Sequence, residues 1–464
     1  MRVGMTHPFQ PRISADPVHP FRAFARRSPA RAAALVFVGA AAAFSILLAL
    51  PIASSDGRAT PIVDAFFTGV SAFTVTGLTT LDTAEHWSFF GQFVILLAIQ
   101  TGGLGIVTIA LLLARAVTRQ LGVQTKLFAQ QSIGTSKLGE VKTLLRIVVL
   151  TTLTIEGVLF LFLLPPFLLL EEHWWDGLWN ALFYAVSAFN NAGFSTHVGG
   201  IQSMEANLWI LVPLAVGVFV GSFGFPVFLT LILHKWNKKR WTLHTKLTLF
   251  TTTVLLVVGA VGWAALEWNN PTTVATDDPV GKILHALFAS TMMRSGGFAI
   301  IDPALSQPAT LLLSDALMFV GGGSASTAGG IKVTTLAVLF LAIVAEARGD
   351  KSVLAAGRTI PNESLRVAIS VTFLGATLVL GATAIIQIVN PDVGLDRILF
   401  EVISAFATCG LSVGLSAELG PVGKWVLTVL MVAGRIGPIG LASALALKHR
   451  NLLFRLPEER PIIG

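Results

Sequence analysis

The chain has 464 residues, of which 54% are hydrophobic and only 12% charged, which excludes an ordinary soluble protein. Apolar stretches of about 20 residues, long enough to cross a bilayer as a helix, recur along it. The net charge of +7 lies in short segments between apolar runs, as in cytoplasmic loops of membrane proteins rather than in a nucleic-acid interface. The single cysteine, Cys409, excludes an intrachain disulfide and cannot by itself form a metal site.

The first 31 residues are basic and rich in proline, with four Arg residues close to the first apolar run. One reading is a signal peptide cleaved at Ile52-Ala53-Ser54. The apolar run is longer than the hydrophobic region of such peptides, which favours a cytoplasmic tail followed by a retained helix. Much of this tail is expected to be disordered or to lie on the membrane surface.

The rest of the chain predicts an all-α membrane protein of four pseudo-symmetric repeats, with eight spanning helices and four re-entrant segments around a central pore. In each repeat, a long apolar helix is followed by a helix too short to span, a polar loop and a second apolar helix. Such loops are tolerated at membrane depth only where protein buries them or water lines them. The expected helices are Ala32–Pro51, Ile62–Phe73 and Ser88–Val117 in repeat one (32–117); Leu144–Leu170, Asp176–Phe189 and Leu208–Leu233 in repeat two (144–233); Leu247–Leu266, Pro279–Met293 and Leu311–Ala345 in repeat three (247–345); and Val367–Val389, Leu395–Ala407 and Val422–Leu447 in repeat four (367–447).

Most Lys and Arg residues lie in the two tails, 1–31 and 448–464, and around three linkers, 118–143, 234–246 and 346–366. Loops within the repeats are acidic instead, as at Glu171-Glu172 and Asp277-Asp278. The positive-inside rule therefore places the tails and linkers in the cytoplasm, and the polar loops enter from outside. Orientation alone accounts for most of these basic residues, and a partner-binding surface is an added alternative.

The four polar loops are in phase with one another. Each is centred on a glycine, and the four glycines are spaced about 110 residues apart. Taking the glycine as position zero, a hydroxyl residue stands at −6, a large apolar residue at +1 and another at −10. These residues are Ser71, Ser187, Thr291 and Ser404; Leu78, Phe194, Phe298 and Leu411; and Phe67, Phe183, Leu287 and Phe400.

Glycine lets the backbone adopt unusual dihedrals and approach an axis closely. Four such loops on one axis would present rings of carbonyl oxygens, which can replace the hydration shell of a monovalent cation. The short helices would point the negative ends of their dipoles toward the same space. A charged side chain is not needed, and only the third loop carries one, Arg294. The alternative, a simple turn residue in each hairpin, would suit one copy better than four in phase.

A glycine-rich stretch, residues 321–330, interrupts the second helix of repeat three. Each glycine costs a helix up to about 1 kcal/mol relative to alanine, so the helix is expected to break near the middle of the membrane. A phosphate-binding loop is disfavoured, because the Gly-x-x-x-x-Gly-Lys-Ser/Thr spacing is absent and no strand precedes it. A packing kink between helices is the other alternative.

Two basic residues stand within the apolar segments. Arg435 lies in the last helix, where an ionisable residue is costly unless it meets water or a polar partner, so it is a functional candidate. Lys332 follows the glycine-rich stretch. It either acts with Arg435 or extends its ammonium toward the cytoplasm.

Together these motifs resemble the Trk/Ktr/HKT superfamily of potassium transporters, and most of all its KtrB-type membrane subunits. The resemblance covers about residues 32–447. It rests on the four loops, on the glycine-rich stretch, and on two further segments. In this sequence the motifs are Thr74-Val75-Thr76-Gly77-Leu78, Asn190-Asn191-Ala192-Gly193-Phe194-Ser195-Thr196, Arg294-Ser295-Gly296-Gly297-Phe298, Ala407-Thr408-Cys409-Gly410-Leu411, Gly321–Lys332, Gln100–Gly105 and Gly434-Arg435-Ile436-Gly437-Pro438. The third loop departs from the family in having Gly296 where a small residue such as alanine is more usual.

The resemblance implies a selectivity filter for dehydrated K⁺ and a gate beneath it. The filter would use the backbone carbonyls of Val75, Thr76, Gly77, Leu78, Asn191, Ala192, Gly193, Phe194, Ser295, Gly296, Gly297, Phe298, Thr408, Cys409, Gly410 and Leu411. The gate would comprise Gly321, Gly322, Gly323, Ser324, Ala325, Ser326, Thr327, Ala328, Gly329 and Gly330, with Lys332 and Arg435. Asn191 and Thr408 are polar where the first loop has Val75, an asymmetry expected to relax selection of K⁺ over Na⁺.

The resemblance also implies the assembly and its control. The family forms homodimers in the cytoplasmic (inner) membrane, each protomer with its own pore, on a cytoplasmic RCK-type ring of nucleotide-binding regulatory subunits. This chain is expected to bind no nucleotide itself, and Na⁺ is an expected activator whose site the sequence does not locate. The basic linkers and the tail 448–464 are the expected contact surfaces.

Two other classes of function compete with ion uptake. A secondary transporter of an organic solute would have broken helices around a midplane site, but such folds usually show two repeats, not four. A membrane-embedded enzyme would need a paired-carboxylate, metal-ligand or nucleophile–base constellation in the spans, and the sequence offers none. We therefore expect a non-enzymatic potassium transporter.

Overall fold

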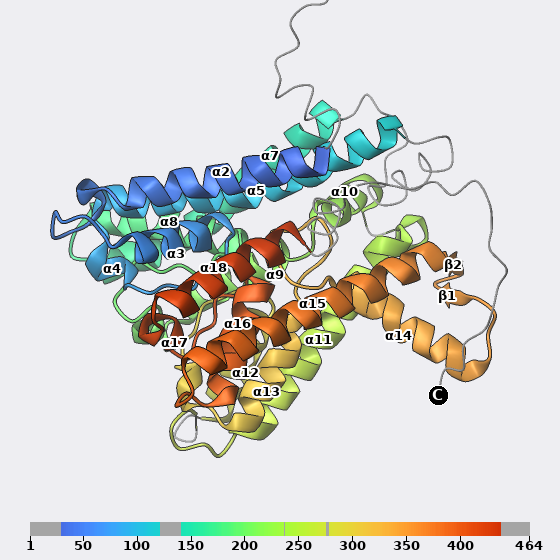
Figure 1. Cartoon of the computed structure of the whole chain (residues 1–464). Coiled ribbons are helices and arrows are strands. Elements are labelled where there is room, and N and C mark those ends of the chain that lie inside the picture. The colour runs from blue at the N-terminus through green and yellow to red at the C-terminus, as the bar shows by residue number, and fades with distance from the viewer. Residues whose placement is uncertain (1–28, 121–140, 236, 275–277, 438–464) are drawn as a thin grey trace, which may run out of the picture.

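The structure is a computed structural model that describes residues 29–120, 141–235, 237–274 and 278–437 (Figure 1). The expectations for the N-terminal tail, for most of the linker 118–143 and for the chain after Gly437 lie outside these residues. Within them the chain is mostly helical, as the sequence predicts, apart from one short hairpin.

Four long apolar helices each pack on a shorter helix that follows in the chain. The long helices are α2 (Pro29–Leu48), α7 (Val141–Leu170), α11 (Leu243–Glu267) and α15 (Asn362–Val389). The shorter ones are α3 (Ile62–Phe73), α8 (Trp174–Phe189), α12 (Pro279–Met292) and α16 (Leu395–Ala407). A second set of helices follows the loops: α5 (Phe89–Gln120), α9 (Leu208–Gly221), α10 (Phe225–His234), α13 (Pro308–Phe319), α14 (Val333–Arg348) and α18 (Pro421–Ile436).

Local sequence signals account for several helix ends. Asp278 caps α12 by accepting the N–H of Gly281 at 3.0 Å, and Pro279 follows at the first helical position. Thr242 caps α11 in the same way, accepting the N–H of Thr245 at 3.2 Å. At the other end, α14 stops on Gly349, whose φ is 70°.

The helices close into a circle. Each of α5, α9 and α13 packs on the short helix of the following repeat, which is α8, α12 and α16 respectively, and α18 packs on α3. An ion pair reinforces the last contact, because Lys424 Nζ of α18 lies 2.7 Å from Asp64 Oδ1 of α3. Two helices that are far apart in the sequence, α18 and α3, are thereby joined.

The short helices form the core of this circle. In α16 every residue from Phe400 to Ala407 is buried, and α3 and α8 are buried over their last six residues or more. Phe67, Phe183 and Phe400, the residues at position −10, are at most 1% exposed. The third repeat departs, since Leu287 at the same position is 42% exposed.

The prediction of one continuous helix at Leu208–Leu233 is wrong. The chain breaks at Ser222–Gly224, and α9 and α10 meet at an angle of 92°. Gly224 has a φ of 90°, and the N–H of Phe225 donates to the carbonyl of Ala325 at 3.1 Å. The break thus makes room for the glycine-rich stretch of another repeat, a partner that the apolar run itself does not reveal.

The linker 346–366 contains a hairpin that the sequence analysis missed. Strands β1 (Val353–Ala355) and β2 (Arg358–Ile360) pair antiparallel, with Val353 opposite Ile360. Ala356 and Gly357 both have positive φ, as in the tight turns that suit hairpins, but Ala-Gly lacks the usual Asn-Gly signal. Figure 1 shows the hairpin beside α14, at the opposite end of the molecule from the short helices α4 (Thr83–His86) and α17 (Leu415–Glu418).

Several helices have the length and composition of membrane spans. In the described residues, Val148–Leu170, Leu243–Glu267 and Asn362–Val389 meet both criteria, and the bent pair α9–α10 adds a fourth if it counts as one span. Shorter apolar helices occur at Ala34–Leu48, Ile62–Phe73, Phe89–Gly105 and Pro308–Phe319. The figure of eight spans stays a prediction.

Candidate functional site

The glycines of the four polar loops are neighbours in space. A Cβ added to Gly193 would lie 2.7 Å from the Cα of Gly297, and one added to Gly410 would lie 3.2 Å from the Cα atoms of Gly297 and Gly77. A Cβ on Gly77 would lie 3.3 Å from the Cα of Gly193. The loops therefore follow one another in chain order around a common centre, and only glycine fits at these positions.

Each loop has the same alternation of backbone dihedrals. φ is positive at the glycine and again two residues earlier, at Val75 (55°), Asn191 (60°), Ser295 (68°) and Thr408 (46°), but not at the residue between. Such alternation turns successive peptide groups to one side of the chain. Val75 and Thr408 are β-branched, so a positive φ strains them, and strain of this kind concentrates at functional sites.

The structure brings all four predicted stretches, 75–78, 191–194, 295–298 and 408–411, to this centre. Their side chains point into the protein: Val75, Ala192 and Cys409 are fully buried. The glycines of the first three loops are partly exposed. The thiol of Cys409 donates to the carbonyl of Met292 at 3.4 Å, so it packs between two loops rather than serving as a reactive group.

A serine anchors three of the loops to the helices that precede them. The carbonyls of Ser71, Ser187 and Ser404 accept the N–H of the residue before the glycine, at 2.8 to 2.9 Å. The hydroxyls of Ser71 and Ser404 also accept the N–H groups of Gly77 and Gly410, each at 3.1 Å. The hydroxyl of Ser187 instead donates to the carbonyl of Phe194 at 2.9 Å. In these three loops, the hydroxyl residue six positions before the glycine therefore bonds the loop itself.

The third loop is built differently. Its Gly296 N–H donates to the carbonyl of Met292 at 2.8 Å, one residue further along the helix than in the other loops. Arg294 donates from Nη1 to the carbonyl of Thr252 on α11 at 2.6 Å and is 1% exposed. Its charge is therefore directed into the surrounding helices.

Three further glycines allow the second helices to approach the loops. A Cβ on Gly102 of α5, Gly221 of α9 or Gly434 of α18 would collide with the carbonyl oxygen of the residue four positions before the loop glycine. These carbonyls lie at or next to the C-terminal ends of the short helices. The sequence analysis did not identify this role. The signal that could have revealed it is a glycine in each of these second helices at a similar distance after the loop glycine.

A buried carboxylate behind the second loop was also missed. Glu156 of α7 is 6% exposed and accepts hydrogen bonds from Gln100 Nε2 at 3.0 Å and from Asn190 Nδ2 at 2.9 Å. Asn190 immediately follows α8, so this network fixes the start of the loop. A single acidic residue inside the apolar run 144–170 was the available signal.

The glycine-rich stretch lies directly against the loops. A Cβ on Gly329 would collide with the hydroxyl of Thr408. Thr327 Oγ1 donates to the carbonyls of Phe189, at 3.1 Å, and Gly221, at 3.0 Å. The N–H of Gly323 donates to the carbonyl of Ser222 at 2.7 Å, in the break between α9 and α10.

Both basic residues contact this stretch. Arg435, at the end of the described part of α18 and 4% exposed, donates from Nη1 to the carbonyl of Thr327. Lys332 Nζ donates to the carbonyl of Ala328 at 2.7 Å, so its ammonium turns back onto its own segment rather than extending away. Two positive charges are thus held beside one short piece of backbone. Within the described residues, no cluster of three metal-ligating His, Cys, Asp or Glu side chains occurs.

A family model described as a cation transport protein, TrkH, matches residues 6–451. The chain belongs to the TrkH family of cation transport proteins. Within the Trk/Ktr superfamily it is of the KtrB type, as the resemblance implied. TrkH-family proteins are transporters and not enzymes, and the family together with the apolar helices makes this a multi-pass membrane protein.

Curated relatives of the TrkH family match nearly the whole chain. The Ktr system potassium uptake protein B of Vibrio alginolyticus is 35% identical, over 93% of this chain and 94% of that protein. The Ktr system potassium uptake protein D of Bacillus subtilis is 34% identical (94% and 97%), and the potassium/sodium uptake protein NtpJ of Enterococcus hirae 32% (90% and 93%). The crystal structure of TrkH from Vibrio parahaemolyticus shares the fold, with a TM-score of 0.73, 18% identity, and coverage of 91% of this chain and 85% of that one.

Proposed function

We propose that this protein takes up K⁺ across the cytoplasmic membrane through a four-fold pseudo-symmetric pore. Backbone carbonyls of residues 75–78, 191–194, 295–298 and 408–411 replace the hydration shell of the ion. The observation that carries the proposal is the ring of four glycines, each with the same alternation of φ. The names of the relatives, two potassium uptake proteins and one potassium/sodium uptake protein, support the choice of ion.

The short helices add an electrostatic contribution. Each of α3, α8, α12 and α16 ends within five residues of its loop glycine. The C-terminal end of a helix carries a partial negative charge of about half an elementary charge. Four such ends directed at one centre favour a cation there, without a carboxylate that would hold the ion too tightly to release it.

Residues 321–330 act as the gate, with Arg435 and Lys332 as its charged elements. The segment contacts the second and fourth loops, where an ion leaving the filter would pass. Two cationic groups beside this path raise the barrier to a cation, and displacement of the segment would remove the barrier.

The assembly and orientation are part of the same proposal. The protein forms a homodimer whose protomers each have a pore, and a cytoplasmic RCK-type nucleotide-binding ring controls both. The tails and the basic linkers face the cytoplasm, in keeping with the positive-inside rule. Na⁺ is the proposed activator, and this chain binds no nucleotide.

Uptake of ⁸⁶Rb⁺ into proteoliposomes tests the transport proposal. We expect uptake driven by an inward gradient, competed by K⁺ and unaffected by amino acids or sugars. Competition by an organic solute would instead favour a secondary transporter with a midplane site, and absence of ⁸⁶Rb⁺ uptake under all gradients would overturn the proposal.

A further inference from the structure

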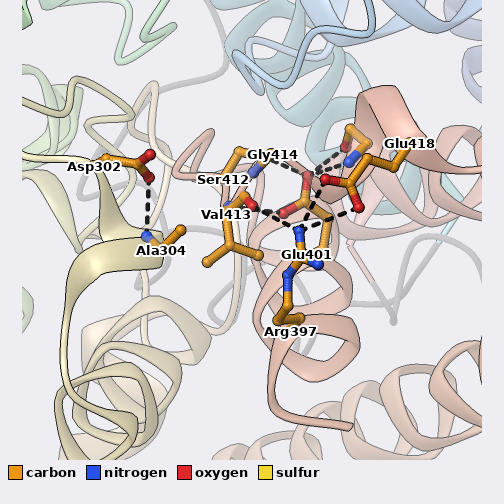
Figure 2. Close-up of polar contacts among 9 residues, drawn as sticks. Asp302, Ala304, Arg397, Glu401, Ser412, Val413, Gly414 and Glu418 are labelled. Atoms are coloured by element: carbon orange, nitrogen blue, oxygen red, sulfur yellow. Dashed lines mark hydrogen bonds and ion pairs between the residues drawn. The ribbon is translucent and has the colours of Figure 1, made fainter. Parts of the chain in front are cut away.

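The segment just outside the fourth loop glycine is tied back to its short helix. Glu401 of α16, fully buried, accepts hydrogen bonds from the Ser412 hydroxyl at 2.7 Å and from the Val413 N–H at 3.2 Å (Figure 2). It also accepts the N–H of Ser416 at 3.0 Å and its hydroxyl at 2.5 Å. Four donors on one carboxylate fix the chain directly after the outermost filter carbonyl, that of Leu411.

A salt bridge strengthens the same segment. Arg397, one turn before Glu401 in α16, donates from Nη2 to both carboxylate oxygens of Glu418, at 3.1 and 3.2 Å, and to the carbonyl of Val413 at 3.2 Å. Figure 2 shows these contacts converging on one loop, whereas the side chain of Asp302 in the third repeat accepts the N–H of Ala304 in its own loop.

The second loop is held by a side chain at the same positions relative to its glycine, but through a tyrosine hydroxyl instead of a carboxylate. Tyr184 stands nine residues before Gly193, as Glu401 stands nine before Gly410, and its hydroxyl bonds the Ser195 hydroxyl at 2.5 Å. Ser195 and Ser412 both stand two residues after their glycine. The Tyr184 hydroxyl also bonds His197 Nδ1 at 2.9 Å.

The first and third loops lack this contact among the described residues. Thr68, at the first −9 position, has a buried hydroxyl with no partner, and Thr79, at +2, makes no side-chain hydrogen bond in the described structure. The third repeat has Phe288 and Ala299 at these positions, which cannot form such a bond. The glycine contacts order the loops one, two, three and four around the centre, so the tied loops are opposite each other.

We propose that Tyr184 and Glu401 are positioning residues of the filter, which fix the chain two residues after the opposed glycines Gly193 and Gly410 and so hold the second and fourth loops at the spacing that suits K⁺. The two untied loops are free to adjust as ions enter. Selection of K⁺ over the smaller Na⁺ then depends on the two tied loops, because a mobile ring contracts around Na⁺ whereas a fixed one does not.

The inference rests on the proposed function, and its test compares uptake of ⁸⁶Rb⁺ and ²²Na⁺ by the full-length protein in proteoliposomes. We expect Tyr184→Phe, which removes only a hydroxyl, and Glu401→Gln each to lower the K⁺ over Na⁺ preference about five-fold, roughly the factor of one lost hydrogen bond. We expect Thr79→Ala, at the same +2 position of an untied loop, to leave the preference unchanged. Ser195→Ala should change it much less in the Tyr184→Phe background than alone, because both substitutions remove the same bond.

If Glu401→Gln does not yield folded protein, Ser412→Ala removes one of its four bonds and takes its place beside Tyr184→Phe. An unaltered preference in both tied loops, with ⁸⁶Rb⁺ uptake intact, would overturn the inference and leave the transport proposal standing. So would an equal change in Thr79→Ala. Absence of K⁺-competed uptake in the unsubstituted protein would overturn the transport proposal instead.

Discussion

Gly77 occupies a position where both space and dihedral angle require glycine. Its φ is 91°, and an added Cβ would collide with the carbonyl oxygen of Ala192 in the neighbouring loop. We expect Gly77→Ala to reduce ⁸⁶Rb⁺ uptake at least about ten-fold, because the collision displaces an oxygen of the proposed filter and the new side chain is strained. Uptake assays in proteoliposomes measure this directly.

Gly57→Ala separates the effect of backbone strain from the effect of the collision with the neighbouring loop. Gly57 also has positive φ, 71°, but a Cβ there would meet nothing within 4 Å. It therefore carries the same kind of backbone strain without the collision, and we expect nearly normal uptake. Equal losses in both variants would show that strain alone, and not the meeting of the loops, explains the effect.

Glu156 gives a second test, of stability. Glu156→Ala leaves Gln100 Nε2 without its acceptor and removes one of the three acceptors around Asn190 Nδ2. The unpaired donor and the cavity together are expected to lower the free energy of unfolding by about 3 kcal/mol. Thermal unfolding of the solubilised protein measures the loss, with Thr154→Ala at an exposed position of the same helix as the control. A loss no larger than that of the control would contradict the role given to the network.

The loop glycines and the serines six positions earlier could be read from the sequence because they recur in phase. Glu156 and Gly221 could not be assigned in this way, since their roles depend on which helices pack together. Gly221 in particular faces the carbonyl of Phe189 only because α9 crosses the end of α8.

Arg435 makes one of the hydrogen bonds that hold the glycine-rich segment in place. We expect Arg435→Ala to raise the maximal rate of uptake several-fold, because it removes both a charge-assisted hydrogen bond and a positive charge beside the ion path. Initial rates of ⁸⁶Rb⁺ uptake at saturating concentration measure the effect.

Arg348→Ala is the matched control for this change. Arg348 lies in the last turn of α14, is exposed, and follows the same glycine-rich segment in the chain. Replacing Arg348 by alanine changes the net charge by the same amount as Arg435→Ala but removes no contact with the glycine-rich segment. Uptake by Arg435→Ala that matched both the unsubstituted protein and this control would remove Arg435 from the gate.

The loop between α8 and α9 carries a histidine whose protonation is linked to stability. Burial lowers the pKa of His197 from its ordinary value of 6.5, although Glu171, 2.9 Å from Nε2, acts in the opposite direction. Tyr184 and the stacked ring of Phe167 complete its surroundings. Because the unfolded chain binds this proton more readily, the stability that the neutral imidazole contributes is complete above pH 6.5 and is lost as the pH falls below it.

We therefore expect the unfolding temperature to fall between pH 7.5 and 5.5 by more in the unsubstituted protein than in His197→Gln. His173→Gln, which replaces an exposed histidine just before α8, should behave like the unsubstituted protein. An identical pH dependence in all three proteins would contradict the assignment.

The short helices could be placed from the sequence almost to the residue, as at Ile62–Phe73 and Leu395–Ala407, because proline or glycine marks their starts and the polar loops mark their ends. The break between α9 and α10 could not, since its cause, the segment of residues 321–332, comes from another repeat. The β1–β2 hairpin could not be predicted for a local reason, because its Ala-Gly turn lacks the Asn-Gly pair that usually indicates a hairpin.

The circular order of the four loops and their helices is the feature on which the proposed transport depends. It is produced by the packing of each second helix on the next short helix and is completed by the Lys424–Asp64 ion pair. The repeated loops in the sequence implied such a circle, but they could not give the order of contacts around it. That order places the two tied loops opposite each other. It is the basis of the proposal that two loops of the filter are fixed and the other two can adjust.

Crystals grown with Tl⁺ in place of K⁺ provide the most direct test of the proposed ion path, since the anomalous signal of Tl⁺ locates bound ions. We expect peaks on the axis enclosed by Gly77, Gly193, Gly297 and Gly410, surrounded by main-chain oxygens of all four loops. Strong Tl⁺ peaks only elsewhere in the protein, with none among the four glycines, would contradict the account.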